Sequence, residues 1–542
     1  MHPPLIPVWT AAESSSADAA TISAGVPSRA LMQRAGAAAA AEIARRYPDL
    51  LRAGVVIHAG RGNNGGDAWV VARALANAGV PCRVDTHGDP STDDCRAERA
   101  LAEQALAGAP SVDGEGAIVV DGLLGTGARG APRGAVAESI ARIAKARAAG
   151  AVVVALDVPS GVDATTGEAT GAVRADLTLT FGGVKRGLLV ARESAGAIAV
   201  LEIGLLASAV REVAADGPPS PVTPAESGTT NPPLLVSGRW VRAVLPSFPA
   251  SAHKGTRRKL VLIGGARGMA GACVLAARAA LRSGIGMVRL LVDPASIGAV
   301  QAAVPEAMAS DWTLGNDALR DDVSNWADTI ALGPGLGRGE EARALVERLL
   351  RAWTGPVLLD ADALNAFEGQ SAALAELLAG RPALLTPHVA EFSRLSSIPV
   401  QEVLANPFEV ATPLAAQLGA TILLKGVPTV IHAPDGRRLV SAAGTPVLAT
   451  AGSGDLLSGI ASTLLAQLGD PLVAGGAAAW AHGRAAELAA RRLASGHEAD
   501  RAPRPMPVRG VTLADVLDAL PSVWTEAPLA PILPVLAELP AL

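Results

Sequence analysis

The sequence is poor in cysteine and in long apolar runs, and each shortage excludes a class of protein. Three cysteines among 542 residues, Cys82, Cys95 and Cys273, are too few and too scattered for a disulfide framework or a zinc cluster. Residues 1–16 lack the basic and apolar regions of a secretion signal, and no later stretch reaches the run of about twenty apolar residues that spans a bilayer. We therefore expect a cytoplasmic protein with reduced thiols, to which we assign no role.

An excess of positive charge is also missing. There are 46 Lys and Arg against 51 Asp and Glu, a formal net charge of -5, so no basic field is available for nucleic acid or anionic lipid. No Walker lysine motif occurs, which excludes a P-loop mechanism. The expected partners are small molecules, and an anionic ligand must be held by local backbone geometry. The sequence leaves the oligomeric state open, a homo-oligomer included.

The composition and length predict a two-domain α/β protein. Half of the residues are hydrophobic and 18% are charged, and 542 residues exceed what one core organises. Short β-branched runs that end in Gly, Asp or Asn alternate with Ala- and Leu-rich stretches of helical spacing, which indicates mostly parallel sheets covered by helices. The expected strands are residues 54–58, 117–120 and 151–156 in the first half, and 259–263, 329–332, 356–359 and 421–424 in the second.

The domain boundaries follow from proline and serine content. A Pro-, Ser- and Thr-rich stretch over 214–233 predicts a linker between a first domain, 1–213, and a second, 234–525. A last helix is expected over 512–520, and the Pro-punctuated residues 526–542 are expected to be a tail with little function.

A glycine-rich loop, GRGNNGGD over 60–67, follows the first expected strand and precedes a helix expected over 68–78. Its glycines let backbone amides approach a phosphate, and a helix N-terminus adds positive potential. The loop satisfies G-x-G-x-x-G, and Asp85 stands about where a dinucleotide fold has its ribose-binding acid, so a dehydrogenase is one alternative. A Rossmann turn does not need two asparagines and Asp67. A purely structural turn is the other alternative.

Acidic residues end two further expected strands, in DGLLGTG from Asp121 and DVPSG from Asp157. The carboxyl ends of parallel strands converge on one crevice, so these residues and the glycine-rich loop are expected to meet. For Asp157 the alternative is an Asx-type turn or cap before Pro159.

Together these segments resemble the N-terminal domain of the NAD(P)H-hydrate epimerases, from Arg29 to about Ile203, with ADLTLTFG over 175–182 and Lys185 included. The resemblance implies a Rossmann-like three-layer αβα domain in which Asp157 is the acid/base residue at C6 of the hydrated nicotinamide ring. It implies a potassium ion bound by Asn64, Asp121 and Ser160. It also implies that the hydrated dinucleotide is bound by Asn63, Asn64, Gly65, Gly66, Asp67, Gly125, Thr126, Gly127, Ala128, Arg129, Gly130, Ala131 and Asp157. The family usually has glycine where Ala68 stands, and a positive φ there would strain the loop.

In the second half the most specific pattern is ATAGSGD over 449–455, which leads into a helix expected over 456–465. Amides at the helix N-terminus can form an anion hole for a phosphoryl group, and Asp455 stands where it can accept a hydroxyl proton. A simple helix cap is the alternative for Asp455. The pattern resembles the ribokinase-like superfamily.

Neighbouring motifs narrow this resemblance to the NAD(P)H-hydrate dehydratases, from about Ser251 to Asp515. They are HKG over 253–255, GGARGMAGA over 264–272, GPGLG over 333–337, DADALN over 360–365, TPH over 386–388 and KG over 425–426. The resemblance implies a ribokinase-like αβα domain in which the hydrate faces Ala272, Gly335, His388 and Asp455. ADP, the implied co-substrate, would be held by Lys425, Gly426, Val427, Pro428, Thr429 and Gly454. Magnesium is implied as a charge-neutralising clamp, although no motif shows a metal site.

Three features of the second half stay open at this point. Asp360 and Asp362 are either metal or substrate ligands, or turn and capping groups. His388 is either a ligand-binding residue or a hydrogen-bonded structural group. The family has Pro-Gly after this histidine, whereas this chain has Val389 and Ala390, which could shift the loop.

The two resemblances together predict a repair enzyme for hydrated NADH and NADPH that epimerises the R and S hydrates and dehydrates the S hydrate with ADP, releasing AMP and phosphate. One alternative is a pyridine-nucleotide dehydrogenase fused to a ribokinase-like sugar or vitamin kinase. Another makes the first half a binding module, because similar domains occur in RNA-processing assemblies. The presence of Asn64, Asp121 and Asp157 argues against that module.

Overall fold

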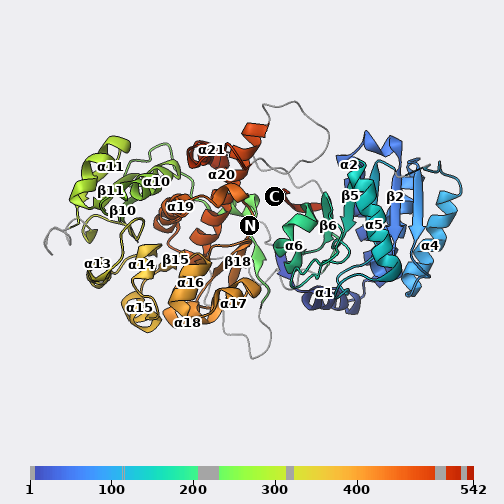
Figure 1. The fold of residues 1–542 in the computed structure, drawn as a ribbon, viewed down its shortest axis with the longest axis horizontal. Coiled ribbons are helices and arrows are strands. Elements are labelled where there is room, and N and C mark those ends of the chain that lie inside the picture. The colour runs from blue at the N-terminus through green and yellow to red at the C-terminus, as the bar shows by residue number, and fades with distance from the viewer. Residues whose placement is uncertain are drawn as a thin grey trace. The chain divides into compact units, whose positions relative to one another are not determined.

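The computed structural model describes residues 6–112, 114, 116–205, 231–312, 323–494, 508–525 and 534–541. These residues form two compact domains, one built from 6–205 and 534–541 and the other from 231–494 and 508–525 (Figure 1). Both domains have the predicted α/β class. Most of the predicted linker, 214–233, lies outside the described residues.

The first domain is built on one sheet of order β19-β8-β6-β5-β4-β2-β3, in which every neighbouring pair is parallel except β19 with β8. The chain leaves β2 toward β3 on one side and returns to β4 on the other. That reversal between β2 and β4 is the place where open α/β sheets bind ligands. Its strands are β2 (Val55–Ala59), β3 (Cys82–Thr86), β4 (Ile118–Gly122), β5 (Val152–Leu156), β6 (Leu177–Phe181), β8 (Ala197–Leu201) and β19 (Val535–Leu539). Two short strands outside this sheet, β1 (Ile6–Trp9) and β7 (Val184–Lys185), pair parallel with each other.

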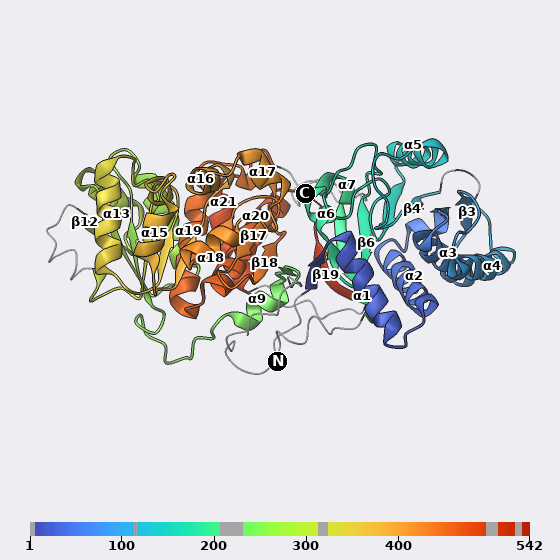
Figure 2. The same cartoon turned by 90° about the horizontal axis from the view of Figure 1, so that it is seen from below.

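Helices cover both faces of this sheet. Val120 and Val154 face α2 and α3, whereas Val119 and Val153 face α5, as expected from the two-residue repeat of a strand. Figure 2 shows α5 on the side of the strands opposite α2 and α3. The helices are α1 (Ala11–Ser23), α2 (Ser28–Arg46), the 3-10 turn η1 (Leu50–Ala53), α3 (Asn63–Asn77), α4 (Asp93–Leu106), α5 (Gly134–Ala148), α6 (Arg186–Val190) and α7 (Arg192–Ala195).

The end of the chain differs from the predicted tail over 526–542. Residues Val535–Leu539 form β19, which pairs antiparallel with β8 of the first domain. Its end residues Val535 and Leu539 are buried, and the Glu538 carboxylate lies 2.8 Å from a guanidinium nitrogen of Arg46. Without β19, β8 would be an exposed edge of the sheet, so β19 has a structural role. The sequence analysis missed this role because the prolines near β19 indicated a tail.

The second domain has a sheet of order β12-β11-β10-β13-β14-β15-β16-β17-β18-β9, parallel from β12 to β16. The strands β16, β17 and β18 pair antiparallel, and β9 pairs parallel with β18. The strands are β9 (Leu234–Leu235), β10 (Lys259–Ile263), β11 (Met287–Val292), β12 (Met308–Asp311), β13 (Thr329–Leu332), β14 (Val357–Leu359), β15 (Ala383–Leu385), β16 (Thr421–Leu424), β17 (Thr429–His432) and β18 (Arg438–Ser441). The four strands predicted in this half are confirmed within one residue.

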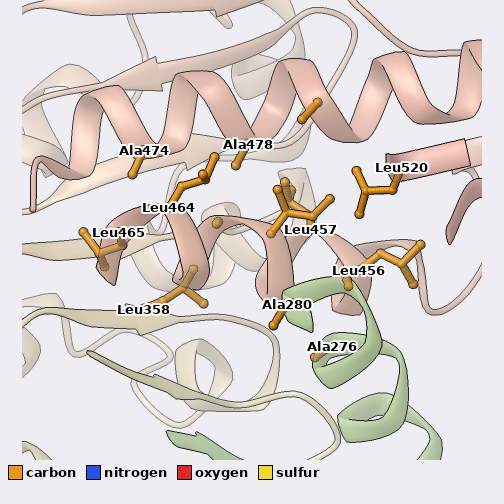
Figure 3. Close-up of a cluster of buried hydrophobic side chains, with 14 of the residues drawn as sticks. Ala276, Ala280, Leu358, Leu456, Leu457, Leu464, Leu465, Ala474, Ala478 and Leu520 are labelled. Carbon is orange, nitrogen blue, oxygen red and sulfur yellow. The ribbon is translucent and has the colours of Figure 1, made fainter. Parts of the chain in front are cut away.

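Two cores lie on the two faces of this second sheet. Successive side chains of β10 point into different cores. Leu260 faces α10, α19 and α20, and Val261 faces α13 to α18. Figure 3 shows the leucines of α19 packed among alanines of α10 and α20. The helices are α9 (Gly238–Val244), α10 (Ala270–Arg282), α11 (Ile297–Ala303), α13 (Glu340–Ala352), α14 (Asp362–Asn365), α15 (Ser371–Leu378), α16 (Val389–Ser396), α17 (Val400–Ala405), α18 (Thr412–Leu418), α19 (Ser453–Leu468), α20 (Pro471–Ala494) and α21 (Leu513–Thr525). Within the described ranges, no helix is long and apolar enough to cross a membrane.

Candidate functional site

A cavity of about 640 Å³ opens in the first domain at the switch between β2 and β4. That volume is in the range of small-molecule sites. The predicted residues that line it are Asn63, Asn64, Asp67, Gly125, Thr126, Gly127, Ala128 and Asp157. The predicted residues Gly65, Gly66, Arg129, Gly130, Ala131, Asp121 and Ser160 do not line it, although all lie on the same segments.

The glycine-rich loop is the start of a helix. Helix α3 begins at Asn63, five residues before the predicted start, so its first turns present the loop to the cavity. A Cβ on Gly65 would lie 1.9 Å from the carbonyl oxygen of Gly60, so only glycine fits. Ala68 is fully buried in the regular helix and has no positive φ, so the anticipated strain does not arise.

The three predicted potassium ligands lie around one short stretch of backbone. Ser160 Oγ donates to Asp121 at 2.6 Å and accepts from the Leu124 amide at 2.9 Å. Asn64 Nδ2 donates to the Leu124 carbonyl at 2.8 Å. The other side-chain atom of Asn64, Oδ1, is buried without a hydrogen-bond partner among the described residues. The structure therefore brings the three residues together and leaves one carbonyl-type oxygen unsatisfied.

Asp157 is held by a buried lysine. Its backbone has a φ of 62°, in the left-handed region that a non-glycine residue rarely adopts. Its Oδ1 lies 2.5 Å from Nζ of Lys185, which also donates to Thr180 Oγ1 and to the Phe181 carbonyl, each at 3.1 Å. Thr180 Oγ1 and the Phe181 amide, at the end of β6, also donate to Asp157 Oδ1, at 3.3 and 3.4 Å. The carboxylate therefore binds residues of β6 and β7, whereas the Asx alternative requires a bond within its own turn.

Two other carboxyl groups of the cavity, those of Asp67 and Asp18, feel the charge of Asp157. Burial raises the pKa of Asp67 well above its usual range, and the charges of Asp157 and Asp18 raise it further. The pKa of Asp18 is also raised, mainly by burial. The positive charge of Lys185 opposes this increase, and the negative charge of Asp157 adds to it. The sequence analysis missed Asp18, because it lies in a serine- and alanine-rich helix, α1, without a motif. Lys185 was noted only as part of a resemblance, and its role emerges from its contact with Asp157.

Asp85, the acid expected of a dehydrogenase, lies elsewhere. It lies in β3, one residue before the end of the strand. Its Oδ1 accepts from Nε of Arg83 at 3.1 Å, and it does not line the cavity. The structure therefore gives no support to the ribose contact on which the dehydrogenase alternative depended.

In the second domain Asp455 lies in the first turn of α19. The preceding Gly452 has a φ of 92°, a conformation suited to glycine, and ends the loop at the start of the helix. Burial raises the pKa of Asp455 to about 7, and the nearby charge of Asp360 contributes to the increase. A carboxyl group with that pKa can exchange a proton near neutral pH.

The predicted hydrate-binding residues Ala272 and Gly335 lie against each other. Gly335 has a φ of 58°, and a Cβ on it would lie 3.1 Å from Cβ of Ala272. The next residue, Cys273, has its pKa raised to about 12 by burial, with a contribution from the charge of Asp455. The beginning of α10 is therefore close to Asp455, and Cys273 is a neutral thiol.

His388 caps a helix in the structure. Its Nδ1 accepts from the amides of Ala390 and Glu391, and the Glu391 carboxylate accepts from the His388 amide at 2.8 Å. His388 and Glu391 therefore form a regular capping box at the start of α16, with Val389 and Ala390 in its first turn. The His388 side chain is half exposed, and burial lowers its pKa. Its contact with substrate stays a prediction.

The predicted nucleotide-binding segment, Lys425 to Thr429, connects β16 to β17. Nζ of Lys425 lies 2.9 Å from Oδ1 of Asp360, and a Cβ on Gly454 would be 3.4 Å from the same nitrogen. Thr429 Oγ1 donates to the carbonyl of Gly426 at 3.1 Å, and the Val427 side chain is exposed. Two of the predicted nucleotide ligands, Lys425 and Gly454, are thus neighbours in space.

The side chains of Asp360 and Asp362 bind other segments of the domain, and their role toward metal or substrate stays a prediction. Oδ2 of Asp362 accepts from the Gly337 amide at 2.9 Å, and both oxygens of Asp360 accept hydrogen bonds from side chains. Among the described residues no three His, Cys, Asp or Glu side chains are grouped as a metal site.

Comparison with known proteins agrees with this division into two sites. Residues 28–187 match the family described as YjeF-related protein N-terminus, and residues 260–507 match the family described as NAD(P)H-hydrate dehydratase. A bifunctional NAD(P)H-hydrate repair enzyme Nnr from Gloeobacter violaceus is 38% identical over 512 residues, 90% of this chain and 95% of that protein. The protein of the same name from Moorella thermoacetica is 34% identical over 524 residues, 92% of each chain.

A solved structure is also similar to the second domain. The ADP/ATP-dependent NAD(P)H-hydrate dehydratase from Bacillus subtilis, co-crystallised with ATP and Mg²⁺, is 32% identical and covers 53% of this chain and 96% of its own, with a TM-score of 0.44. The full-length relatives span both domains at more than 30% identity. This chain therefore belongs to the family of bifunctional NAD(P)H-hydrate repair enzymes.

Proposed function

We propose that the first domain interconverts the R and S hydrates of NADH and NADPH and that the second dehydrates the S hydrate with ADP, releasing AMP and phosphate. The observation that carries this proposal is the placement of one carboxylate in each domain. Asp157 lines a cavity of about 640 Å³ beside Lys185, and Asp455 stands in a glycine-framed helix start beside Lys425 and Gly454. The first domain supplies the S epimer that the second domain consumes, so a single chain repairs both the R and the S hydrate.

In the first domain the reacting carbon, C6, bears a hydroxyl group and is bonded to the ring nitrogen. Asp157, paired with Lys185, takes the hydroxyl proton while the C6–N bond opens, and its electron pair and a proton go to nitrogen. The raised pKa of Asp67 favours the protonated form of this carboxyl group, so Asp67 is suited to supply the second proton. Rotation about the C5–C6 bond and reversal of the two transfers close the ring on its other face.

Potassium fits the residues expected to hold it. Asn64, Asp121 and Ser160 offer the oxygen ligands that a hard cation prefers, and the unpartnered Oδ1 of Asn64 is the supporting observation. The ion would supply positive charge beside the cavity. We expect Asn64→Ala to remove the potassium-dependent part of the thermal stability of the first domain, measured by melting in potassium against sodium chloride. An equal response in variant and wild type would contradict this assignment.

In the second domain Asp455 accepts the proton of the C6 hydroxyl group, whose oxygen then attacks the β-phosphorus of ADP and displaces AMP. Lys425 and the N-terminus of α19 stabilise the transferred phosphoryl group. Phosphate is a good leaving group, so it departs with the C6–O electrons, and loss of a C5 proton restores the ring double bond. Magnesium would neutralise phosphate charge, held mainly by the nucleotide, because the described residues group no three carboxylate, histidine or cysteine ligands.

The direct test is to incubate the purified protein with both hydrate epimers, with and without ADP, and to follow each species by chromatography. We expect interconversion of the epimers without ADP and recovery of absorbance at about 340 nm, where the restored dihydronicotinamide absorbs, with ADP and no added reductant. ATP in place of ADP shows which nucleotide is used. Phosphorylation of a free sugar or vitamin, with no loss of hydrate, would overturn the proposal.

A further inference from the structure

Asp360 connects three elements of the second domain. It directly follows β14 and is almost completely buried. Its Oδ1 lies 2.9 Å from Nζ of Lys425, which follows β16, and its Oδ2 accepts from Oγ of Ser458 at 2.5 Å. Ser458 is fully buried in α19, three residues after Asp455. The carboxylate therefore links two strand ends to the helix that carries the proposed base.

The ammonium group of Lys425 is fixed by these contacts. Burial acts to lower the pKa of Lys425, but the charges of Asp360 and Glu391 outweigh it and raise the pKa. The nearest oxygen of Glu391 is 3.8 Å from Nζ, against 2.9 Å for Asp360, so Asp360 is the closer partner. A free lysine side chain has many rotamers, and this pairing selects the one beside Gly454.

Asp360 also acts on Asp455 through its charge. No hydrogen bond joins the two carboxyl groups, yet the charge of Asp360 is the largest contribution, after burial, to the raised pKa of Asp455. Lys425 lowers this pKa, and Asp362 raises it. Two further titratable groups lie close to this turn of α19: Cys273 is a neutral thiol because burial raises its pKa to about 12, and His482, whose Nε2 is 3.3 Å from Ser453 Oγ, has its pKa lowered to about 4 by burial.

We propose that Asp360 is a positioning residue of the dehydratase site, which holds the Lys425 ammonium at the beginning of α19 and places a fixed negative charge near Asp455. This inference rests on the proposed function of the second domain. The position of Lys425 decides how well phosphoryl charge is stabilised. The negative charge makes Asp455 a stronger base for the hydroxyl proton.

Asp360→Asn tests this role, because the amide keeps the size and can still accept from Ser458 but cannot hold an ammonium ion by charge. We expect kcat of dehydration to fall by about 10- to 100-fold and KM for ADP to rise by a smaller factor. We also expect the acidic limb of the pH profile of kcat, near pH 7 in the wild type, to move to lower pH because Asp455 loses a nearby negative charge.

Two further variants separate position from charge. Lys425→Met removes a positive charge, so its acidic limb should move to higher pH, in the opposite direction. Ser458→Ala leaves both charges in place, so it should lower kcat less and leave the limb unchanged. Asp435→Asn, in the exposed turn between β17 and β18, is the matched control and should behave as wild type.

A poorly folded variant stays readable when kcat is calculated per folded second domain, counted from the stoichiometry of ADP binding in calorimetry. The inference would be overturned if Asp360→Asn had the kcat and the acidic limb of the wild type. It would also be overturned if the acidic limb moved in the same direction in Asp360→Asn and in Lys425→Met. Absence of ADP-dependent dehydration in the wild type would instead overturn the proposed function.

Discussion

The two sites use one lysine each, but they use it differently. In the first domain Lys185 contacts the proposed catalytic carboxylate, Asp157, directly. In the second domain Lys425 is bonded to Asp360, and the proposed base Asp455 stands apart with a pKa raised to about 7. The like charge near Asp455 makes this carboxyl group take up protons more readily, so it is the stronger base.

Among changes that test this difference between the two sites, we expect Asp455→Asn to have the largest effect on activity. The amide cannot accept the hydroxyl proton, so we expect kcat of dehydration to fall by about 100- to 10,000-fold. The affinity for ADP, measured by calorimetry, should stay within about threefold, as expected of a base rather than a binding group. Epimerisation should be unaffected because it belongs to the other domain. Dehydration at the wild-type rate would remove Asp455 from catalysis.

Asp157→Asn is the corresponding change in the first domain. We expect epimer interconversion to slow by about 100-fold or more, because Asn cannot take the C6 hydroxyl proton. The measurement follows pure R hydrate by chromatography in the absence of ADP. The urea midpoint of the first domain, followed by circular dichroism and compared with wild type, is the control for folding. An unchanged epimerisation rate would show that Asp157 only maintains the structure around Lys185.

Lys185→Met sharpens the contrast by removing one partner of the direct pair. Lys185 is almost fully buried, so Asp157 would be left without its ammonium partner, and we expect the first domain to lose about 3 kcal/mol of unfolding free energy. Urea inactivation of the epimerase, compared with that of the dehydratase in the same tube, measures this loss. The double variant Lys185→Met with Asp157→Asn should recover part of it, since no unpaired charge remains. Equal midpoints for wild type and Lys185→Met would contradict the ion-pair role.

Removal of residues 534–542 should produce the smallest of these effects, and only in the first domain. The change exposes the outer edge of β8 and the apolar area covered by Val535 and Leu539, a loss of roughly 2 kcal/mol. The epimerase should melt earlier and aggregate more readily, while the dehydratase keeps its melting temperature. Glu538→Gln, which removes only an exposed carboxylate, should cost less than about 1 kcal/mol. An unchanged epimerase melting temperature after truncation would show that β19 contributes nothing.

The sequence by itself determined the α/β class, seven strands of the two sheets and the segments that carry the proposed sites. These are local properties. The spacing of apolar residues, the glycine clusters and the acidic residues at strand ends can each be recognised within a few residues of sequence. Parallel strands bring their carboxyl ends to one edge, so the approach of Asn64, Asp121 and Ser160 also followed from the pattern. The start of α3 at Asn63 was missed because its polar first turn resembles a loop.

Only the tertiary structure decided which side chains contact one another over long separations. Lys185 lies 28 residues from Asp157, and Lys425 lies 65 residues from Asp360, and neither spacing has a sequence signature. The same holds for Asp18, which enters the cavity from a helix without a motif, and for β19, which joins a strand formed more than 300 residues earlier. Burial and neighbouring charge set the protonation of a carboxyl group, and both depend on packing that no local pattern specifies.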